Sequence, residues 1–277
     1  MKLNVRELNE VSNEIRKDIV TMLHESGSGH PGGSLSSADV LAALYFNVMN
    51  IDPENPKKEG RDKFVLSKGH AAPVLYAALA RRGYFDPSEL LKLRKMGAML
   101  QGHPDMKGTP GVEMSTGSLG QGFSTAVGMA IAGKLDKKSD RVFALLGDGE
   151  MNEGLVWEAM MSAAHYKLDN LVAIVDHNGL QIDGPNAHVM GLDPLKEKWE
   201  SFGWNAIDVD GHDIEALLAA FEAADKTENK PTVLIAKTIK GKGVSYMEDL
   251  AGWHGKAPSS EELQIALKDL GGDNYEY

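Results

Sequence analysis

Cysteine is absent from the 277 residues of this sequence. Disulfide bonds, thiolate metal sites and a cysteine nucleophile are therefore excluded, and a reducing compartment such as the cytoplasm is expected. Long apolar runs are also absent, so no membrane-spanning segment is predicted, and residues 1–20 lack the apolar core of a signal peptide.

Positive charge is scarce, because 29 lysines and arginines face 40 acidic residues and leave a formal net charge of −11. Nucleic acid and anionic membranes are not expected as partners, since both normally bind a basic face.

The apolar pattern predicts strands and helices that alternate along the chain. Strands apolar on both faces indicate a parallel sheet covered on each side, so we expect an α/β fold with a doubly wound parallel sheet and helices on both faces. No linker divides the chain, which predicts a single domain of residues 1–277. The predicted strands are 63–66, 141–146, 171–175, 205–209 and 232–237. The predicted helices are 5–23, 37–49, 73–82, 119–135, 154–166, 194–202 and 213–224.

Two further segments have their own signatures. Residues 26–34, with the sequence SGSGHPGGS, predict a glycine- and serine-rich loop. Residues 258–277 indicate a short capped helix and a natural terminus.

Polar turns follow two neighbouring predicted strands. The second strand runs into Gly147-Asp148-Gly149, and the third runs into a turn that contains Asn178. Because the carboxyl ends of parallel strands meet at one edge of a sheet, we expect Asp148 and Asn178 to lie close together. Their carboxylate and amide oxygens, with the backbone carbonyl of Leu180, suit Mg²⁺ or Ca²⁺, and two diphosphate oxygens and water would complete the shell. The glycines allow close approach of a phosphate, to which the amide of Gly149 can donate. Gly-Asp-Gly alone fits many ordinary turns. The metal site is favoured only because this turn is paired with the turn that contains Asn178.

Four of the nine histidines lie in tight loops lined by glycine or proline: His30, His70, His103 and His254. An imidazole can hydrogen-bond a sugar hydroxyl, transfer a proton or contact a phosphate. Each of these histidines alone is better explained as a loop histidine with a local hydrogen-bond partner. His212 precedes a predicted helix cap and is interpreted as structural. No chemical role is predicted for the others, which are His24, His165, His177 and His188.

A further glycine-rich turn, residues 116–122, leads into a predicted helix. One interpretation is an open helix start, in which Gly117 leaves room for a flat ligand against Leu119. The other is a compact turn before a helix of small residues that packs closely on its neighbour. The residues themselves favour neither interpretation.

Together these segments resemble the transketolase family of thiamine-diphosphate enzymes. The matching stretches are SGHPGGSLSSADVLAALY, DKFVLSKGHAAPVLYAAL, GHPD, STGSLGQGFSTAVGMAIA, the GDG turn with its later asparagine, and KTIKGKGVSYMEDLAGWHG. They extend from about residue 26 to residue 254. The GDG turn and asparagine are shared by thiamine-diphosphate enzymes in general, whereas the histidine loops are typical of transketolases. The resemblance implies the diphosphate-binding domain of the thiamine-diphosphate-binding fold.

The resemblance also implies roles for the residues of the two polar turns and of the glycine-rich turn. Asp148, Asn178 and the carbonyl of Leu180 match the ligands of a cofactor-bound Mg²⁺, for which Ca²⁺ or Mn²⁺ are alternatives. Gly117 and Leu119 match the pocket beside the aminopyrimidine ring of the cofactor.

The histidine loops match both cofactor and substrate contacts of the family. His70, His254 and Gly149 correspond to contacts with the diphosphate. His30, His103 and His254 correspond to the histidines that hydrogen-bond the donor sugar and assist its proton transfers.

Two acids at the start of the helix after the GDG turn, Glu153 and Glu158, match acids at a subunit interface of the family. We group Glu153 with the catalytic candidates. Carboxylates are also favoured at helix N-termini for electrostatic reasons, so this match is weaker than that of the metal ligands.

A complete transketolase is roughly twice as long as this chain. In the family, the glutamate that activates the cofactor and most groups that hold the sugar phosphate belong to a pyrimidine-binding domain, to which nothing here corresponds. The resemblance therefore implies a C-terminal partner subunit, in a dimer of heterodimers with sites at subunit interfaces.

The implied activity is transfer of a two-carbon ketol unit from a ketose phosphate to an aldose phosphate in the pentose phosphate pathway. The alternatives are a related transferase or synthase for an unusual sugar, such as a sulfonated or branched one, and a non-catalytic cofactor-binding module. A metal-dependent phosphohydrolase is disfavoured, because the sequence places no second acidic cluster at that edge.

Overall fold

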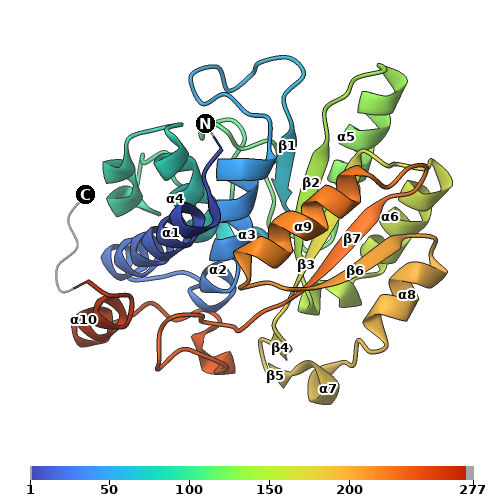
Figure 1. The fold of residues 1–277 in the computed structure, drawn as a ribbon. Helices are drawn as coiled ribbons and strands as arrows, with labels where there is room; N and C mark the ends of the chain where they lie inside the picture. The colour runs from blue at the N-terminus through green and yellow to red at the C-terminus, as the bar shows by residue number, and fades with distance from the viewer. Residues whose placement is uncertain (1, 273–277) are drawn as a thin grey trace.

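Five parallel strands form the main sheet of the computed structural model, which describes residues 2–272 (Figure 1). They lie in the order β1-β2-β3-β7-β6, because the chain leaves β3 for the edge strand β6 and returns to place β7 between them. Every neighbouring pair is parallel. The strands are β1 (Lys63–Leu66), β2 (Val142–Gly147), β3 (Leu171–His177), β6 (Asn205–Asp210) and β7 (Thr232–Lys237). Each coincides with a predicted strand, and the doubly wound parallel α/β fold is confirmed.

Residues alternate along the central strands between two separate apolar layers. In β2, Phe143 and Leu145 pack into the layer that contains the N-terminal helices. Val142, Ala144 and Leu146 point the other way and pack beneath the later helices. Complete burial of one such leucine contributes about 1.5–3 kcal/mol to stability, so both faces of the sheet must be covered.

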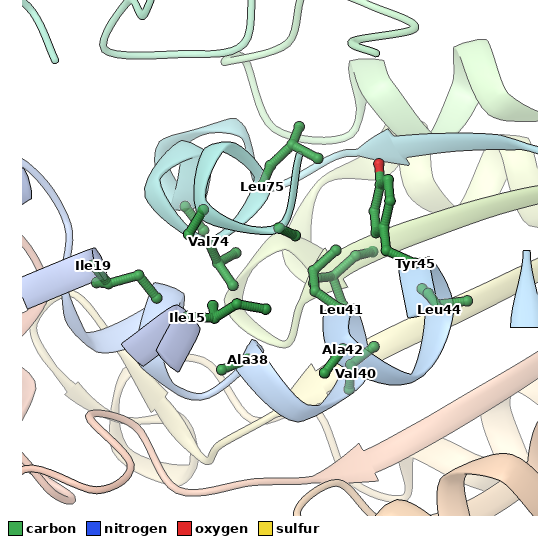
Figure 2. Packing of buried hydrophobic residues seen from close by; sticks show 14 of the residues in the cluster. Ile15, Ile19, Ala38, Val40, Leu41, Ala42, Leu44, Tyr45, Val74 and Leu75 are labelled. Carbon is green, nitrogen blue, oxygen red and sulfur yellow. The ribbon is translucent and has the colours of Figure 1, made fainter. Parts of the chain in front are cut away.

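The first layer is built around α1, which starts with a capping box between Asn4 and Glu7. Figure 2 shows Ile15 of α1 in the same layer as Leu41 of α3 and Val74 of α4. The apolar spacing along α1 therefore places one face of this helix against its two neighbours. The layer contains α1 (Val5–Ser26), α3 (Ala38–Ala43), α4 (Ala72–Arg82) and α9 (Ile214–Asp225).

The second layer is dominated by aromatic packing. Trp199 is fully buried, and its ring centroid lies 4.7 Å from that of Trp204 and 6.1 Å from that of Phe123. The indole nitrogen of Trp204 donates to the carbonyl of Met160 at 3.0 Å, so this buried polar atom is satisfied. The layer contains α5 (Gln121–Leu135), α6 (Gly154–His165) and α8 (Leu195–Ser201).

Several predicted boundaries were wrong, including the end of α1, which continues three residues beyond the predicted residue 23. The predicted loop 26–34 ends in a short helix, α2 (Gly32–Leu35). The helix predicted for residues 37–49 is α-helical only in α3 and continues as a π-helical turn, η1 (Leu44–Val48). Helix α5 begins two residues later than predicted, because Gly120 has a φ of 79°, a left-handed conformation that a helix cannot include.

The structure also contains elements too short for periodicity to reveal. A two-stranded antiparallel hairpin follows β3 and lies close to the end of that strand (Figure 1). The short elements, including the two strands of this hairpin, are η2 (Gly69–Ala71), η3 (Pro87–Lys92), η4 (Gly149–Asn152), β4 (Leu180–Gln181), β5 (Gly184–Pro185), α7 (Asn186–Val189) and η5 (Ala251–Trp253).

The predicted C-terminal helix is present as α10 (Ser260–Asp269). It begins with a capping box between Ser259 and Glu262. The rest of the predicted tail, residues 273–277, lies outside the described residues. Among the helices of residues 2–272, none combines the length and the hydrophobicity needed to cross a bilayer.

Candidate functional site

A cavity of about 360 Å³ opens at the carboxyl edge of the sheet, above the ends of β2 and β3. The residues that line it come from loops far apart in the sequence. Most of the predicted site residues are among them: His30, His70, Gly117, Leu119, Asp148, Gly149, Asn178, Leu180 and His254. Two predicted residues, His103 and Glu153, are not among the lining residues.

The carboxylate of Asp148 joins the two polar turns. It accepts hydrogen bonds from the backbone of Gly149 at 2.8 Å and of Gly179 at 2.7 Å. The side-chain amide of Asn186 donates to it at 2.8 Å. Burial, together with the negative charge of Asp176, raises the pKa of Asp148 above its ordinary value despite these donors. A cation would favour the ionised form, so the carboxylate is suited to a positively charged ligand.

Asn178 has a side chain whose orientation is determined by its neighbours. Its amide nitrogen donates to the buried carboxylate of Asp176 at 2.9 Å, and its amide oxygen accepts from the backbone of Leu180 at 3.1 Å. The adjacent Gly179 amide bonds Asp148, so the two turns meet at the edge where they were expected. The role of these oxygens as metal ligands stays a prediction.

The amide of Gly149 is already in use in this structure, since it donates to the side chain of Asp148. It starts the four-residue 3₁₀ turn η4 rather than a long helix. Contact between Gly149 and a diphosphate also stays a prediction.

A buried lysine in the lining of the cavity was not predicted. The ammonium of Lys68 lies 2.7 Å from the carboxylate of Asp176, and donates at the same distance to the carbonyl of Gly33 and the hydroxyl of Ser37. Ser36 donates to Asp176 as well, at 2.7 Å. Burial alone would raise the pKa of Asp176, but the charge of Lys68 and the hydrogen bonds from Lys68, Thr238 and Ser36 together hold it below its ordinary value. Both charges are therefore paired.

Lys240 is a second buried cation at the cavity. Its ammonium lies 3.1 Å from Nδ1 of His254. Burial lowers the pKa of Lys240, an effect opposed by Asp176 and Asp148. Close packing holds the stem of Lys240, because a Cβ on Gly32 would lie only 2.9 Å from its Cγ. Because Lys68 is paired with Asp176, Lys240 is the buried lysine that supplies a positive charge for an anion at this cavity.

Neither lysine has a sequence signal as clear as that of the polar turns. Lys68 directly precedes Gly69-His70, and Lys240 lies in a Lys-Gly-Lys-Gly stretch shortly after β7. The available signal was a lysine next to a glycine, shortly after the end of a predicted strand. It is weak, because most lysines in such loops are solvated.

Three of the predicted histidines form a cluster at the cavity. The ring centroids of His30, His70 and His254 lie 5.1–5.4 Å apart. Burial, assisted by the charge of Lys68, lowers the pKa of His70 to about 2. Burial and Lys240 lower the pKa of His254 to about 4, and burial also lowers that of His30. The three imidazoles are therefore neutral near pH 7, and each can donate one hydrogen bond and accept another.

His103 lies behind the glycine-rich turn that lines the cavity. A Cβ on Gly117 would be 3.3 Å from Cδ2 of His103. The backbone carbonyl of His103 accepts from the hydroxyl of Tyr76 at 2.9 Å, which anchors its loop on α4. Burial and the charge of Arg94 lower the pKa of His103, so this imidazole is also neutral near pH 7. His103 borders the predicted site without lining the cavity.

The acids after the GDG turn occupy different environments. Glu153 and Glu158 are exposed, and Glu153 caps α6 without a side-chain hydrogen bond. Glu150, which was not predicted, is buried, and burial raises its pKa. Its carboxylate accepts from the hydroxyl of Ser67 at 2.5 Å and from the backbone of Gly120 at 2.8 Å. Glu150 thereby connects the turn after β2 to those before η2 and α5.

Comparison with known proteins shows the family to which this chain belongs. The family model described as the thiamine diphosphate binding domain of transketolase matches residues 8–277. The chain belongs to the transketolase family.

Two relatives within the transketolase family match over nearly their full length, and both are named as single subunits. The first, an apulose-4-phosphate transketolase subunit of Phocaeicola vulgatus, is 42% identical over 268 residues, which cover 97% of this chain and 95% of that protein. The second, the 6-deoxy-6-sulfo-D-fructose transketolase subunit SqwG of a Clostridium species, is 46% identical, with 95% of this chain and 96% of that protein covered.

Other transketolases are longer than this chain. Human transketolase is 47% identical over 264 residues, which cover 95% of this chain but 42% of the human protein. The crystal structure of transketolase from Campylobacter jejuni has a TM-score of 0.92 and 34% identity, with 98% of this chain and 44% of that one covered. The chain thus spans less than half the length of these transketolases.

Proposed function

We propose that this chain is the N-terminal subunit of a two-subunit transketolase and binds the diphosphate end of thiamine diphosphate through a divalent metal. The observation that carries the proposal is that Asp148 and Asn178 line one cavity, where the backbone of Gly179, next to Asn178, donates to Asp148 beside neutral histidines. The match to stand-alone transketolase subunits over nearly their whole length supports an enzyme built from two different chains.

The donor set fits Mg²⁺, with Ca²⁺ or Mn²⁺ as alternatives. Asp148 supplies one carboxylate, Asn178 an amide oxygen and Leu180 a backbone carbonyl, all of them hard oxygen ligands. The amide nitrogen of Asn178 donates to Asp176, and its oxygen accepts one hydrogen bond from the backbone of Leu180, so the second lone pair of that oxygen is left for the cation. Within residues 2–272 no three His, Cys, Asp or Glu side chains cluster as a metal site, so a transition-metal site of soft ligands is not favoured.

The diphosphate would be held by one lysine and by neutral, hydrogen-bonding imidazoles on the same side of the cavity. Lys240, His70 and His254 line it, and the backbone at Gly149 carries no side chain that would block a phosphate. Gly117 and Leu119 lie at the part of the cavity proposed for the aminopyrimidine ring. When bound, the cofactor supplies the electron sink for cleavage of a carbon–carbon bond beside a carbonyl.

This chain's own contribution to the chemistry is hydrogen bonding and proton transfer to the sugar. His30, His103 and His254 are neutral near pH 7, and can donate to a sugar hydroxyl or accept its proton. The exposed Glu153 and Glu158 fit the proposed interface role better than a role inside the cavity.

A C-terminal subunit with the pyrimidine-binding domain would supply the activating glutamate and most contacts with the sugar phosphate, in a dimer of heterodimers. We propose a ketose phosphate as donor and an aldose phosphate as acceptor. An unusual sugar is the second candidate, because two relatives of matching length are named for apulose-4-phosphate and 6-deoxy-6-sulfo-D-fructose.

The single domain of residues 1–277, the pentose phosphate pathway and the cytoplasmic location stay predictions.

The test is reconstitution. The chain is purified alone and with its co-purifying partner, and two-carbon transfer is assayed with thiamine diphosphate and Mg²⁺ on ordinary, branched and sulfonated ketoses. Transfer only by the pair is the expected result. A pair that binds the cofactor but transfers no two-carbon unit would indicate the non-catalytic module instead.

A further inference from the structure

His212 lies outside the cavity, in the turn between β6 and α9, and its ring bonds two different segments. Nδ1 lies 2.7 Å from the carboxylate of Asp39, and Nε2 accepts from the backbone amide of Ile239 at 2.8 Å. A backbone amide can only donate, so Nε2 carries no proton. The proton is therefore on Nδ1 and is donated to Asp39. The interpretation of His212 as a purely structural residue omits this link.

Asp39 is a rigid anchor for that imidazole. Its side chain is 3% exposed and forms an ion pair with Arg16, so α1 and α3 both contribute to the anchor. Burial alone would raise the pKa of Asp39, but Arg16 and the hydrogen bond from His212 lower it to about 2. Asp39 is therefore a carboxylate near pH 7, and as an acceptor it favours the Nδ1–H tautomer of His212.

Ile239 lies between two residues that belong to the cofactor site. On one side, the hydroxyl of Thr238 donates to the buried carboxylate of Asp176. On the other side, Lys240 lines the cavity beside His254. The amide that His212 holds is therefore the backbone link between a group that orients Asp176 and a cation that faces the cavity.

We propose that His212, held by Asp39, is a positioning residue that fixes the segment 238–240 so that Lys240 meets the diphosphate of the cofactor. This inference rests on the proposed function and adds to it a residue that does not line the cavity. A displacement of the segment would move the lysine and the donor to Asp176 together. Groups behind a binding site commonly change its affinity through such small displacements.

Two substitutions distinguish a positioning role of His212 from the mere filling of space by its side chain. His212→Leu fills similar space but leaves the amide of Ile239 and the carboxylate of Asp39 without this partner. His212→Gln retains an amide oxygen for Ile239 and an amide hydrogen for Asp39. Asn170→Ala is the control, since it removes a comparable hydrogen bond, 3.0 Å long to the carbonyl of Ala130, near the opposite edge of the sheet.

The experiment titrates the complete two-subunit enzyme with thiamine diphosphate at constant Mg²⁺ by calorimetry, and records the denaturation temperature without cofactor. His212→Leu is expected to raise Kd about tenfold, the effect of one lost hydrogen bond to a partly buried group. His212→Gln is expected to restore Kd to within about threefold of the unsubstituted enzyme. Asn170→Ala should lower the denaturation temperature and leave Kd unchanged.

An unchanged Kd in His212→Leu, or no recovery in His212→Gln, would overturn the inference. If His212→Leu does not fold, His212→Asn takes its place, because the shorter amide reaches only one partner. An affinity equal to that of the unsubstituted enzyme in His212→Asn would then overturn the inference. Failure of the unsubstituted enzyme to bind the cofactor is a different result, because it would overturn the proposed function itself.

Discussion

The ammonium of Lys68 and the carboxylate of Asp176 form a buried ion pair, 2.7 Å long, in the lining of the candidate cofactor site. Each side chain is 2% exposed. The pair connects the loop after β1 to the end of β3, and Asp176 in turn orients the amide of Asn178. The orientation of the predicted metal ligand thus depends on an ion pair that is itself part of the cavity lining.

Loss of the cation from this pair should destabilise the protein strongly. Lys68→Met leaves Asp176 as an unpaired buried charge, so the free energy of unfolding should fall by about 3–5 kcal/mol in chemical denaturation. Lys92→Met is the control, since its 2.6 Å pair with Glu89 is largely exposed. That change should cost about 0–1 kcal/mol. Equal stability of the two variants would show that the pair at Asp176 is not a buried charge pair in solution.

The metal assignment predicts a specific loss at Asp148. Asp148→Ala should weaken Mg²⁺-dependent binding of thiamine diphosphate more than about 100-fold in calorimetry, because even groups behind metal ligands change affinity about 10–100-fold. Asp183→Asn removes an exposed carboxylate from the lining of the same cavity and should retain metal dependence. Unchanged affinity in Asp148→Ala would reject the metal site.

A different result is expected at His103, which borders the cavity without lining it. His103→Ala should leave cofactor affinity unchanged and lower kcat of the reconstituted enzyme by about a hundredfold, the effect of losing a proton-transfer group. His165→Ala, at an exposed position on α6, is the control. A large loss of cofactor binding in His103→Ala would instead place this histidine at the cofactor.

The histidine cluster predicts a stability that falls in acid. An unfolded histidine has a pKa of about 6.5. Burial and Lys240 lower that of His254 to about 4 in the folded state. The unfolded chain then binds the proton more readily, so the free energy of unfolding falls as the pH drops from about 6.5 towards 4. Burial and Lys68 depress the pKa of His70 further, to about 2, which extends the same trend.

Denaturation temperatures measured without cofactor from about pH 7.5 to about pH 4.5 test this dependence. His254→Asn should flatten it, because one depressed pKa is removed. His188→Asn, at an exposed position, should not change it. A slope that is identical in the unsubstituted protein and in His254→Asn would contradict the buried, neutral state of His254.

Local patterns predicted much of the fold and part of the site. Four of the five strands contain short runs of apolar residues, and β6 alternates apolar and polar residues. Asp148 and Asn178 followed from their places after two of these strands. The hairpin of β4 and β5 was missed, since strands of two residues have no measurable period. The start of α5 was misplaced, because nothing local distinguished Gly120 as the left-handed residue.

The sequence by itself determined which residues stand at the carboxyl edge of the sheet, because strand ends and turns are encoded within a few neighbouring positions. Only the tertiary structure decided which charges are buried there. Lys68 meets Asp176 across 108 positions, and His212 reaches Asp39 across 173. Whether such a side chain is solvated or paired depends on which distant segments cover it, and no local pattern contains that information.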